Sequence, residues 1–144
     1  MRLSCKKLFM GVIAASFACH DPVAAPPPDA YALANINGRP LPTFVLAIPE
    51  APTITSAVLL LERSGRARLT EHRRDMGGTD LTYTSNYTYK INGNNIQFEY
   101  NPPCPPNAIC VAPPSGTIAS SRLLLTMYGP NSEIVYDFVL MAID

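Results

Sequence analysis

The chain has 144 residues, with eleven lysines and arginines against eleven aspartates and glutamates, so its formal net charge is zero. This length suits one domain with one hydrophobic core. The balanced charge argues against a general nucleic-acid binder, which carries a strongly basic surface. No stretch has the apolar period of a long amphipathic helix.

The N-terminus has the features of an export signal. Three basic residues within the first seven positions precede an apolar run that ends at Ala18. This run is too short to cross a bilayer as a helix, which needs roughly 20 apolar residues. A basic start followed by a short apolar core and small residues is typical of a signal peptide. We therefore predict a signal peptide over residues 1–18, a proline-rich tether over 19–29 and a folded domain over 30–144.

Two kinds of processing fit the residues before Cys19. Ser16 and Ala18 are small, as a general signal peptidase requires, so cleavage there would release a secreted or periplasmic protein. The same stretch resembles a bacterial lipobox, in which a small residue precedes a cysteine that becomes diacylated. That resemblance implies lipidation of Cys19 and a membrane-anchored lipoprotein of the bacterial cell envelope, at the outer membrane or facing the periplasm. The secreted form remains the alternative, because Ser16 and Phe17 are not the residues usual in a lipobox.

Removal of the signal changes the charge and leaves a spacer. Arg2, Lys6 and Lys7 are lost, which leaves eight basic residues against eleven acidic ones and a formal charge of −3. Proline-rich chain extends about 3.1 Å per residue, so the ten residues after Cys19 can span roughly 30 Å.

Short strands and turns follow in chain order. Residues 31–36 and 43–48 are two candidate strands, separated by the turn sequence NGRPLP. Residues 57–74 then read as a hairpin with its bend at Ser64 and Gly65.

The clearest alternation of apolar and polar residues lies in 81–91, which predicts a strand with one buried face. The turn NGNN at 92–95 joins it to a partner strand over 96–100. The tyrosines of the first strand and the apolar residues of its partner are predicted to face inward, namely Tyr83, Tyr87, Tyr89, Ile91, Ile96, Phe98 and Tyr100.

The remaining strands are predicted at 116–119, 122–128 and 133–143. The chain then holds eight or nine strands with turn residues between most neighbours, which favours an all-β, antiparallel up-and-down meander. Closure into a barrel would remove the exposed edges of such a sheet. A two-sheet sandwich is the alternative.

The sequences YALANINGRPLP, VLLLERSGRARLT, YTYKINGNNIQF and YDFVL resemble the small lipocalin-like β-barrel domains of bacterial envelope proteins. The resemblance runs from Tyr31 to the end of the chain and implies a lipocalin-like barrel. True lipocalins open with a Gly-x-Trp motif, and this chain has no tryptophan.

The cysteines divide between three roles. Cys5 leaves with the signal, Cys19 is the candidate lipid anchor, and Cys104 and Cys110 remain as a pair. An even pair in an exported protein predicts a disulfide. The spacing differs from a C-x-x-C redox motif. Metal binding by the pair would need two more ligands, and the only histidines are His20, in the tether, and His72, so we expect no metal and no cofactor.

The cysteine pair lies in a proline-rich segment, residues 101–115, which contains six prolines. No central strand tolerates that density, so the segment must be a loop. A rigid loop that exposes Ile109 and Val111 could dock an envelope protein with little entropic cost. The alternative is a loop stiffened only for stability outside the cytoplasm.

An arginine stripe is the first candidate binding surface. Arg66, Arg68, His72 and Arg74 share one face of the predicted strand at 66–74. Guanidinium groups bind phosphate and carboxylate, so Arg66, Arg68 and Arg74 form a candidate patch for an anion, a headgroup or a partner. The alternative is a solvated outer face, with acidic neighbours such as Glu71 forming local ion pairs.

An aromatic face is the second candidate. Tyr83, Tyr87, Tyr89, Phe98 and Tyr100 could line the mouth of a barrel and bind a small amphipathic ligand, because tyrosine combines an apolar ring with a polar hydroxyl. A filled core is the alternative for a barrel of this strand number. We find no nucleophile elbow and expect no enzymatic activity, so a non-catalytic binding module is the first prediction and a structural or protein-interaction role the second.

Overall fold

The computed structural model describes residues 29–44, 51–129 and 132–142, which form an all-β domain. The predicted signal peptide, Cys19 and nearly all of the tether lie outside the described residues. The strands are β1 (Asp29–Ile36), β2 (Arg39–Pro40), β3 (Thr43–Phe44), β4 (Thr53–Leu61), β5 (Arg66–Arg74), β6 (Asp80–Asn92), β7 (Asn95–Tyr100), β8 (Ser115–Ala119), β9 (Arg122–Tyr128) and β10 (Glu133–Leu140). Within these residues no helix is long and apolar enough to cross a membrane.

Eight of the strands close into an antiparallel barrel. β4 to β10 pair in chain order, β10 pairs with β1, and β1 pairs with β4. Ala32 of β1 lies opposite Val139 of β10 on one side and opposite Val58 of β4 on the other. Because β1 is hydrogen-bonded on both sides, the sheet has no free edge along its barrel strands. The predicted up-and-down barrel is confirmed, and the two-sheet sandwich is not found.

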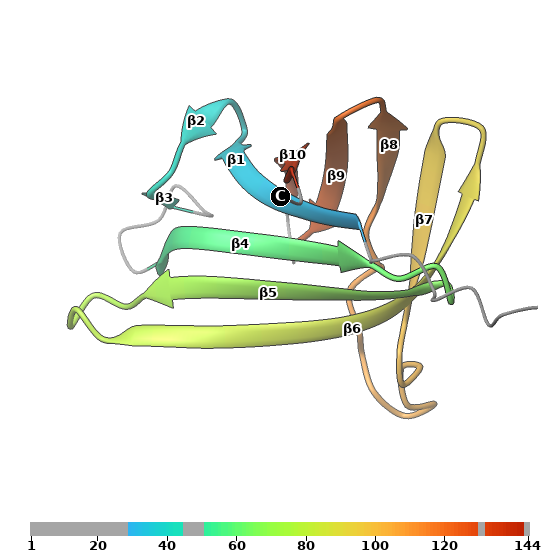
Figure 1. Cartoon of the computed structure of the whole chain (residues 1–144). Helices are drawn as coiled ribbons and strands as arrows, with labels where there is room; N and C mark the ends of the chain where they lie inside the picture. The colour runs from blue at the N-terminus through green and yellow to red at the C-terminus, as the bar shows by residue number, and fades with distance from the viewer. Residues whose placement is uncertain (1–28, 45–50, 130–131, 143–144) are drawn as a thin grey trace, which may run out of the picture.

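The barrel is flattened. β4, β5 and β6 are long and lie side by side, while β7, β8 and β9 run across their direction (Figure 1). The two short strands β2 and β3 are additions, paired with β1 and β4 respectively. Only Thr43 and Phe44 of the predicted strand at 43–48 belong to β3, and its other residues lie outside the described part of the chain.

The predicted hairpins are all present. Two of their turns contain a glycine with a positive φ. Gly65 in the β4–β5 turn and Gly93 in the β6–β7 turn have φ values of 82° and 60°, which glycine adopts without strain. Along β5, Ala67 and Leu69 are buried while their neighbours Arg66 and Arg68 are exposed, as period-2 alternation requires. Every barrel strand except β8 places at least one buried apolar side chain in the core, and Ile118 of β8 packs against it.

The inward face of β6 is shorter than predicted. Tyr87 is buried, but Tyr83 and Ile91 are 46% and 48% exposed. β6 has 13 residues and β7 has six, and β7 pairs with β6 only from Tyr87 to Asn92. Tyr83 therefore lies where β6 has lost its partner β7, and Ile91 lies next to the hairpin turn, so neither side chain is covered.

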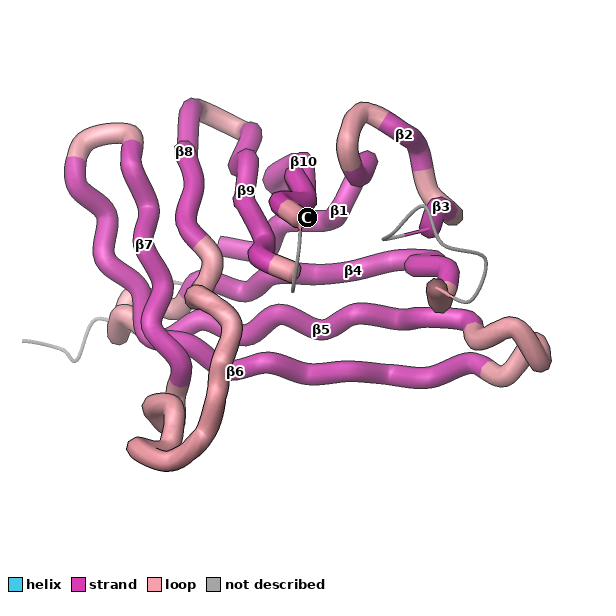
Figure 2. Tube along the Cα trace, turned by 180° about the vertical axis from the view of Figure 1, so that it is seen from behind, coloured by secondary structure: helices cyan, strands magenta, loops and turns pink. Residues whose placement is uncertain are grey.

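The proline-rich segment between β7 and β8 is a loop, as predicted, and projects from the barrel beyond the end of β7 (Figure 2). A disulfide joins Cys104 and Cys110, with their Cα atoms 6.2 Å apart. Both ends of the loop are tied to the barrel, because Asn101 N donates to Asn86 O and Phe98 N donates to Pro114 O.

Candidate functional site

The arginine stripe of β5 separates into two parts. Arg66 and Arg68 line an open pocket of about 230 Å³ on the outer side of the barrel. Arg74 lies at the other end of the strand and is bonded to Asp80 of β6. The strand register decides this division, because it places Asn86 opposite Arg68 but Asp80 opposite Arg74.

The pocket brings together two guanidinium groups and two amide side chains. Arg66 and Arg68 come from β5, Asn86 from β6, and Asn101 from the start of the proline-rich loop. The hydrogen bond between Asn101 N and Asn86 O, 3.0 Å long, holds that loop against β6. The complete lining is Glu62, Arg66, Ala67, Arg68, Asn86, Tyr87 and Asn101. Every polar side chain in this set except that of Glu62 can donate a hydrogen bond to an anion.

Glu62 also lines the pocket but forms no ion pair with its arginines in the part of the chain that the structure describes. Its carboxylate accepts a hydrogen bond from Ser64 Oγ at 3.0 Å, and its backbone carbonyl accepts one from Tyr89 Oη at 2.8 Å. Within the described residues, neither Arg66 nor Arg68 has a carboxylate oxygen within 4.0 Å, whereas Arg73, Arg74 and Arg122 are each in an ion pair. The two pocket arginines thus keep their hydrogen-bonding capacity for a ligand.

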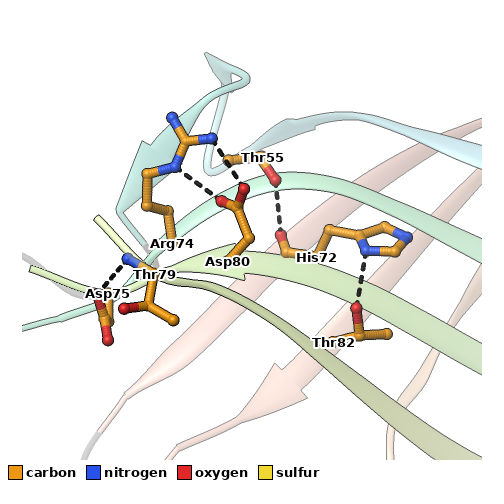
Figure 3. A network of polar contacts seen from close by, with 7 residues as sticks. All are labelled: Thr55, His72, Arg74, Asp75, Thr79, Asp80 and Thr82. Carbon is orange, nitrogen blue, oxygen red and sulfur yellow. Dashed lines mark hydrogen bonds and ion pairs between the residues drawn. The ribbon is translucent and has the colours of Figure 1, made fainter. Parts of the chain in front are cut away.

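The other half of the stripe is closed by β6. Arg74 Nε donates to Asp80 Oδ1 at 2.8 Å and Nη2 to Oδ2 at 3.3 Å, and the hydrogen bond from Arg74 lowers the pKa of the Asp80 carboxyl (Figure 3). The His72 ring contacts Thr82 Oγ1 at 3.1 Å. Arg74 and His72 therefore fit the solvated-face alternative, and Arg66 and Arg68 remain a candidate anion patch.

The five aromatic residues predicted to line a ligand site are also divided. Tyr87 and Phe98 are buried and meet edge to face, with ring centroids 5.6 Å apart. Tyr89 and Tyr100 pack against the same core, and burial raises the pKa of both hydroxyls. These four side chains fill space between the strands by contact with one another, as the filled-core alternative describes.

Tyr83 lies apart from the other four aromatic residues. It stacks on the guanidinium of Arg73, whose Cζ atom is 4.7 Å from the centre of the ring.

A buried polar cluster was not anticipated. Glu71, expected among the outer-face ion pairs, is 5% exposed and faces the core. Its carboxylate accepts hydrogen bonds from Tyr136 Oη at 2.8 Å and from Arg73 Nη2 at 2.7 Å. Burial and the charge of Glu71 raise the pKa of Tyr136. Strict alternation along β5 places residues 67, 69, 71 and 73 on one face. The sequence pattern therefore indicated that Glu71 and Arg73 face the core.

A second ion pair links β9 and β10. Asp137 is 7% exposed. It accepts hydrogen bonds from Asn35 Nδ2 at 2.8 Å and from Arg122 Nε at 3.2 Å. Asp137 pairs with Leu124, which is 43% exposed, so both lie on the outer face. The carboxylate is buried because Arg122 and Asn35 cover it.

The disulfide loop presents one apolar side chain fully to solvent. Ile109 is fully exposed, and Val111 is 46% exposed. Both belong to the loop predicted as a docking surface.

No protein-family model, curated protein or solved structure matches this chain. The barrel is established by its strand pairing, and the candidate site by its own geometry.

Proposed function

We propose that this protein is an exported, lipid-anchored β-barrel of the bacterial cell envelope. In this proposal it is a non-catalytic binding module for a small amphipathic ligand, and it binds the anionic head of that ligand between Arg66 and Arg68. The observation that carries the proposal is the pocket itself, which is lined by two arginines without a carboxylate partner in the described chain and by Asn86 and Asn101.

The chemistry of these groups supports an anion. Arg66 and Arg68 are two residues apart on one strand face, a separation of about 7 Å between their Cα atoms. Two positive charges at this distance repel one another, and a phosphate or carboxylate between them replaces repulsion with attraction. Guanidinium forms two parallel hydrogen bonds to such a group, which adds geometric specificity.

A protein-interaction role is the second candidate. Its support is the full exposure of Ile109 on a loop held by the disulfide. A rigid loop loses little conformational entropy on binding.

Ligand binding is tested with a short-chain lipid in solution. We expect dihexanoylphosphatidylglycerol, titrated as monomer and followed by NMR, to shift the Nε–H signals of Arg66 and Arg68. Arg66→Gln and Arg68→Gln should each weaken binding by about tenfold or more, because a hydrogen bond to a charged group contributes about 1.5–3 kcal/mol. Arg74→Gln is the matched control and should leave affinity unchanged, because Asp80 already occupies that guanidinium.

Equal affinity for dihexanoylphosphatidylcholine, whose headgroup carries no net charge, would contradict an anion site. So would a Kd that is the same in all three arginine variants.

The anchor is tested by intact mass. We expect the processed protein to begin at Cys19 and to carry a diacylglycerol, and globomycin, which inhibits lipoprotein signal peptidase, should cause the precursor to accumulate. A mature protein with a free thiol at Cys19 would show that export ends in release.

A further inference from the structure

The pocket lies beside the point where the domain begins. Ala30 of β1 is opposite Leu60 of β4, Leu60 is opposite Arg68 of β5, and Arg68 is opposite Asn86 of β6. Adjacent strands are about 4.8 Å apart, so Arg68 is two strand spacings, or about 10 Å, from the first strand of the domain. Ten positions separate Asp29 from Cys19, and ten proline-rich residues reach roughly 30 Å.

We propose that the pocket binds anionic phospholipid headgroups of the same membrane that holds the Cys19 lipid, so that the outer face of β5 and β6 lies against the bilayer. This inference rests on the proposed function, since it takes the anchor and the anion site as given and names the lipid. Phosphatidylglycerol-type headgroups have the required chemistry, a single phosphate on an amphipathic molecule within reach of a short tether.

The charge distribution on this face favours a headgroup layer. Each basic residue near an anionic membrane surface contributes about 1 kcal/mol of attraction. Lys90 lies two residues after Thr88, which is opposite Arg66; its side chain is 84% exposed and pairs with Glu99 at 3.8 Å. Glu99 offsets the charge of Lys90, so the attraction to an anionic surface comes from the two pocket arginines, although the mature protein as a whole is acidic.

The opposite side of the barrel provides the competing orientation. β10 lies across the barrel from β6 and carries the partly exposed side chains Val135 and Val139, at 40% and 39%. The ion pair of Asp137 with Arg122 lies between them. Insertion of this face into a membrane would require desolvation of that pair, which is unfavourable.

The chain contains no tryptophan, so a single introduced indole reports the orientation without background. Thr84 is exposed on β6, two residues from Asn86 and outside the pocket lining, and Val135 is its counterpart on β10. The processed, lipidated protein with Thr84→Trp or Val135→Trp is reconstituted into vesicles with dansyl-labelled headgroups. One vesicle set contains phosphatidylethanolamine and phosphatidylglycerol, and the other contains phosphatidylethanolamine and phosphatidylcholine.

We expect stronger energy transfer from the Thr84→Trp variant than from the Val135→Trp variant in phosphatidylglycerol vesicles. Addition of Arg66→Gln and Arg68→Gln to the Thr84→Trp protein should reduce its transfer to the Val135→Trp level, and phosphatidylcholine vesicles should do the same. Addition of Arg74→Gln should leave the transfer unchanged.

Equal transfer from both positions, or transfer indifferent to the two arginine substitutions, overturns the inference. A free inorganic phosphate titration separates the two possible sources of the anion. If phosphate shifts the arginine signals as strongly as dihexanoylphosphatidylglycerol while the two tryptophan positions show equal energy transfer, the site binds a soluble anion. In that case the membrane inference fails while the proposed anion site stands. If neither probe binds, the proposed function fails with it.

Discussion

Gly116→Ala is expected to disrupt the pairing of β8 with β9. A Cβ atom at this position would lie 1.9 Å from the carbonyl oxygen of Leu124 and 3.0 Å from the Cα atom of Leu125. Both contacts are with backbone, so no side-chain rotation relieves them. Because Gly116 is opposite Leu125 in the ladder, the strands must move apart and lose hydrogen bonds.

The expected cost is about 3 kcal/mol or more, at the upper end of what overpacking causes. A domain of this size has a total stability of about 5–15 kcal/mol. Urea unfolding followed by circular dichroism measures the loss. The matched control is Gly77→Ala, because neither glycine has a positive φ and the nearest atom to a Cβ at Gly77 is 3.4 Å away. The control should change stability by less than about 0.5 kcal/mol.

A Gly116→Ala protein as stable as the Gly77→Ala control would show that β8 and β9 are not packed as closely as described. A variant that fails to accumulate at all is consistent with the expected result, provided that the Gly77→Ala protein accumulates normally.

Tyr136→Phe is expected to destabilise the barrel through Glu71. The tyrosine hydroxyl is one of two side-chain donors to a carboxylate that is 5% exposed. Its removal leaves a buried, charged oxygen without that hydrogen bond, which costs about 1–3 kcal/mol. The matched control is Tyr128→Phe, because its hydroxyl is 3.4 Å from the neutral Ser115 hydroxyl and less is lost.

The same variant should change how stability depends on alkaline pH. Burial, followed by the charge of Glu71, raises the pKa of Tyr136 above the ordinary value of 10.0. The unfolded chain therefore releases this proton at a lower pH than the folded protein. The contribution of Tyr136 to stability is complete below pH 10 and decreases as the pH rises further.

Urea unfolding at a series of alkaline pH values measures this slope. Stability should decrease above pH 10 in the wild type and less steeply in Tyr136→Phe. Some decrease should remain in the variant, because four other tyrosines also have raised pKa values, namely Tyr31, Tyr87, Tyr89 and Tyr100. Identical slopes in the two proteins would mean that the Tyr136 hydroxyl is not held next to a buried charge.

Local features of the chain predicted the hairpins. Alternation along 81–91 and the turn at 92–95 concern residues that are neighbours in sequence, and the same holds for the bend at Ser64 and Gly65. The disulfide between Cys104 and Cys110 was predictable for a similar reason, since only six positions separate the two residues. In each case the interaction depends on short-range geometry, which a single sequence displays directly.

The candidate site was only half predictable. Arg66, Arg68 and Arg74 have the same residue type and the same face of one strand, so sequence alone treats them alike. The register with β6 then places the carboxylate of Asp80 opposite Arg74 and the amide residue Asn86 opposite Arg68. Asn101 joined the pocket because a backbone hydrogen bond brings the start of the loop to Asn86. Nothing in the sequence near Asn101 indicates that contact.

The sequence by itself therefore determined the all-β class, the approximate positions of the barrel strands, the hairpin turns and the disulfide, because each depends on residues close together along the chain. Only the tertiary structure decided that β1 closes the barrel by pairing with both β4 and β10, that Tyr83 lies outside the aromatic core, and which arginines of β5 have a carboxylate partner among the described residues. These features depend on contacts between residues distant in sequence, and a residue's type does not reveal which neighbour the folded sheet will place beside it.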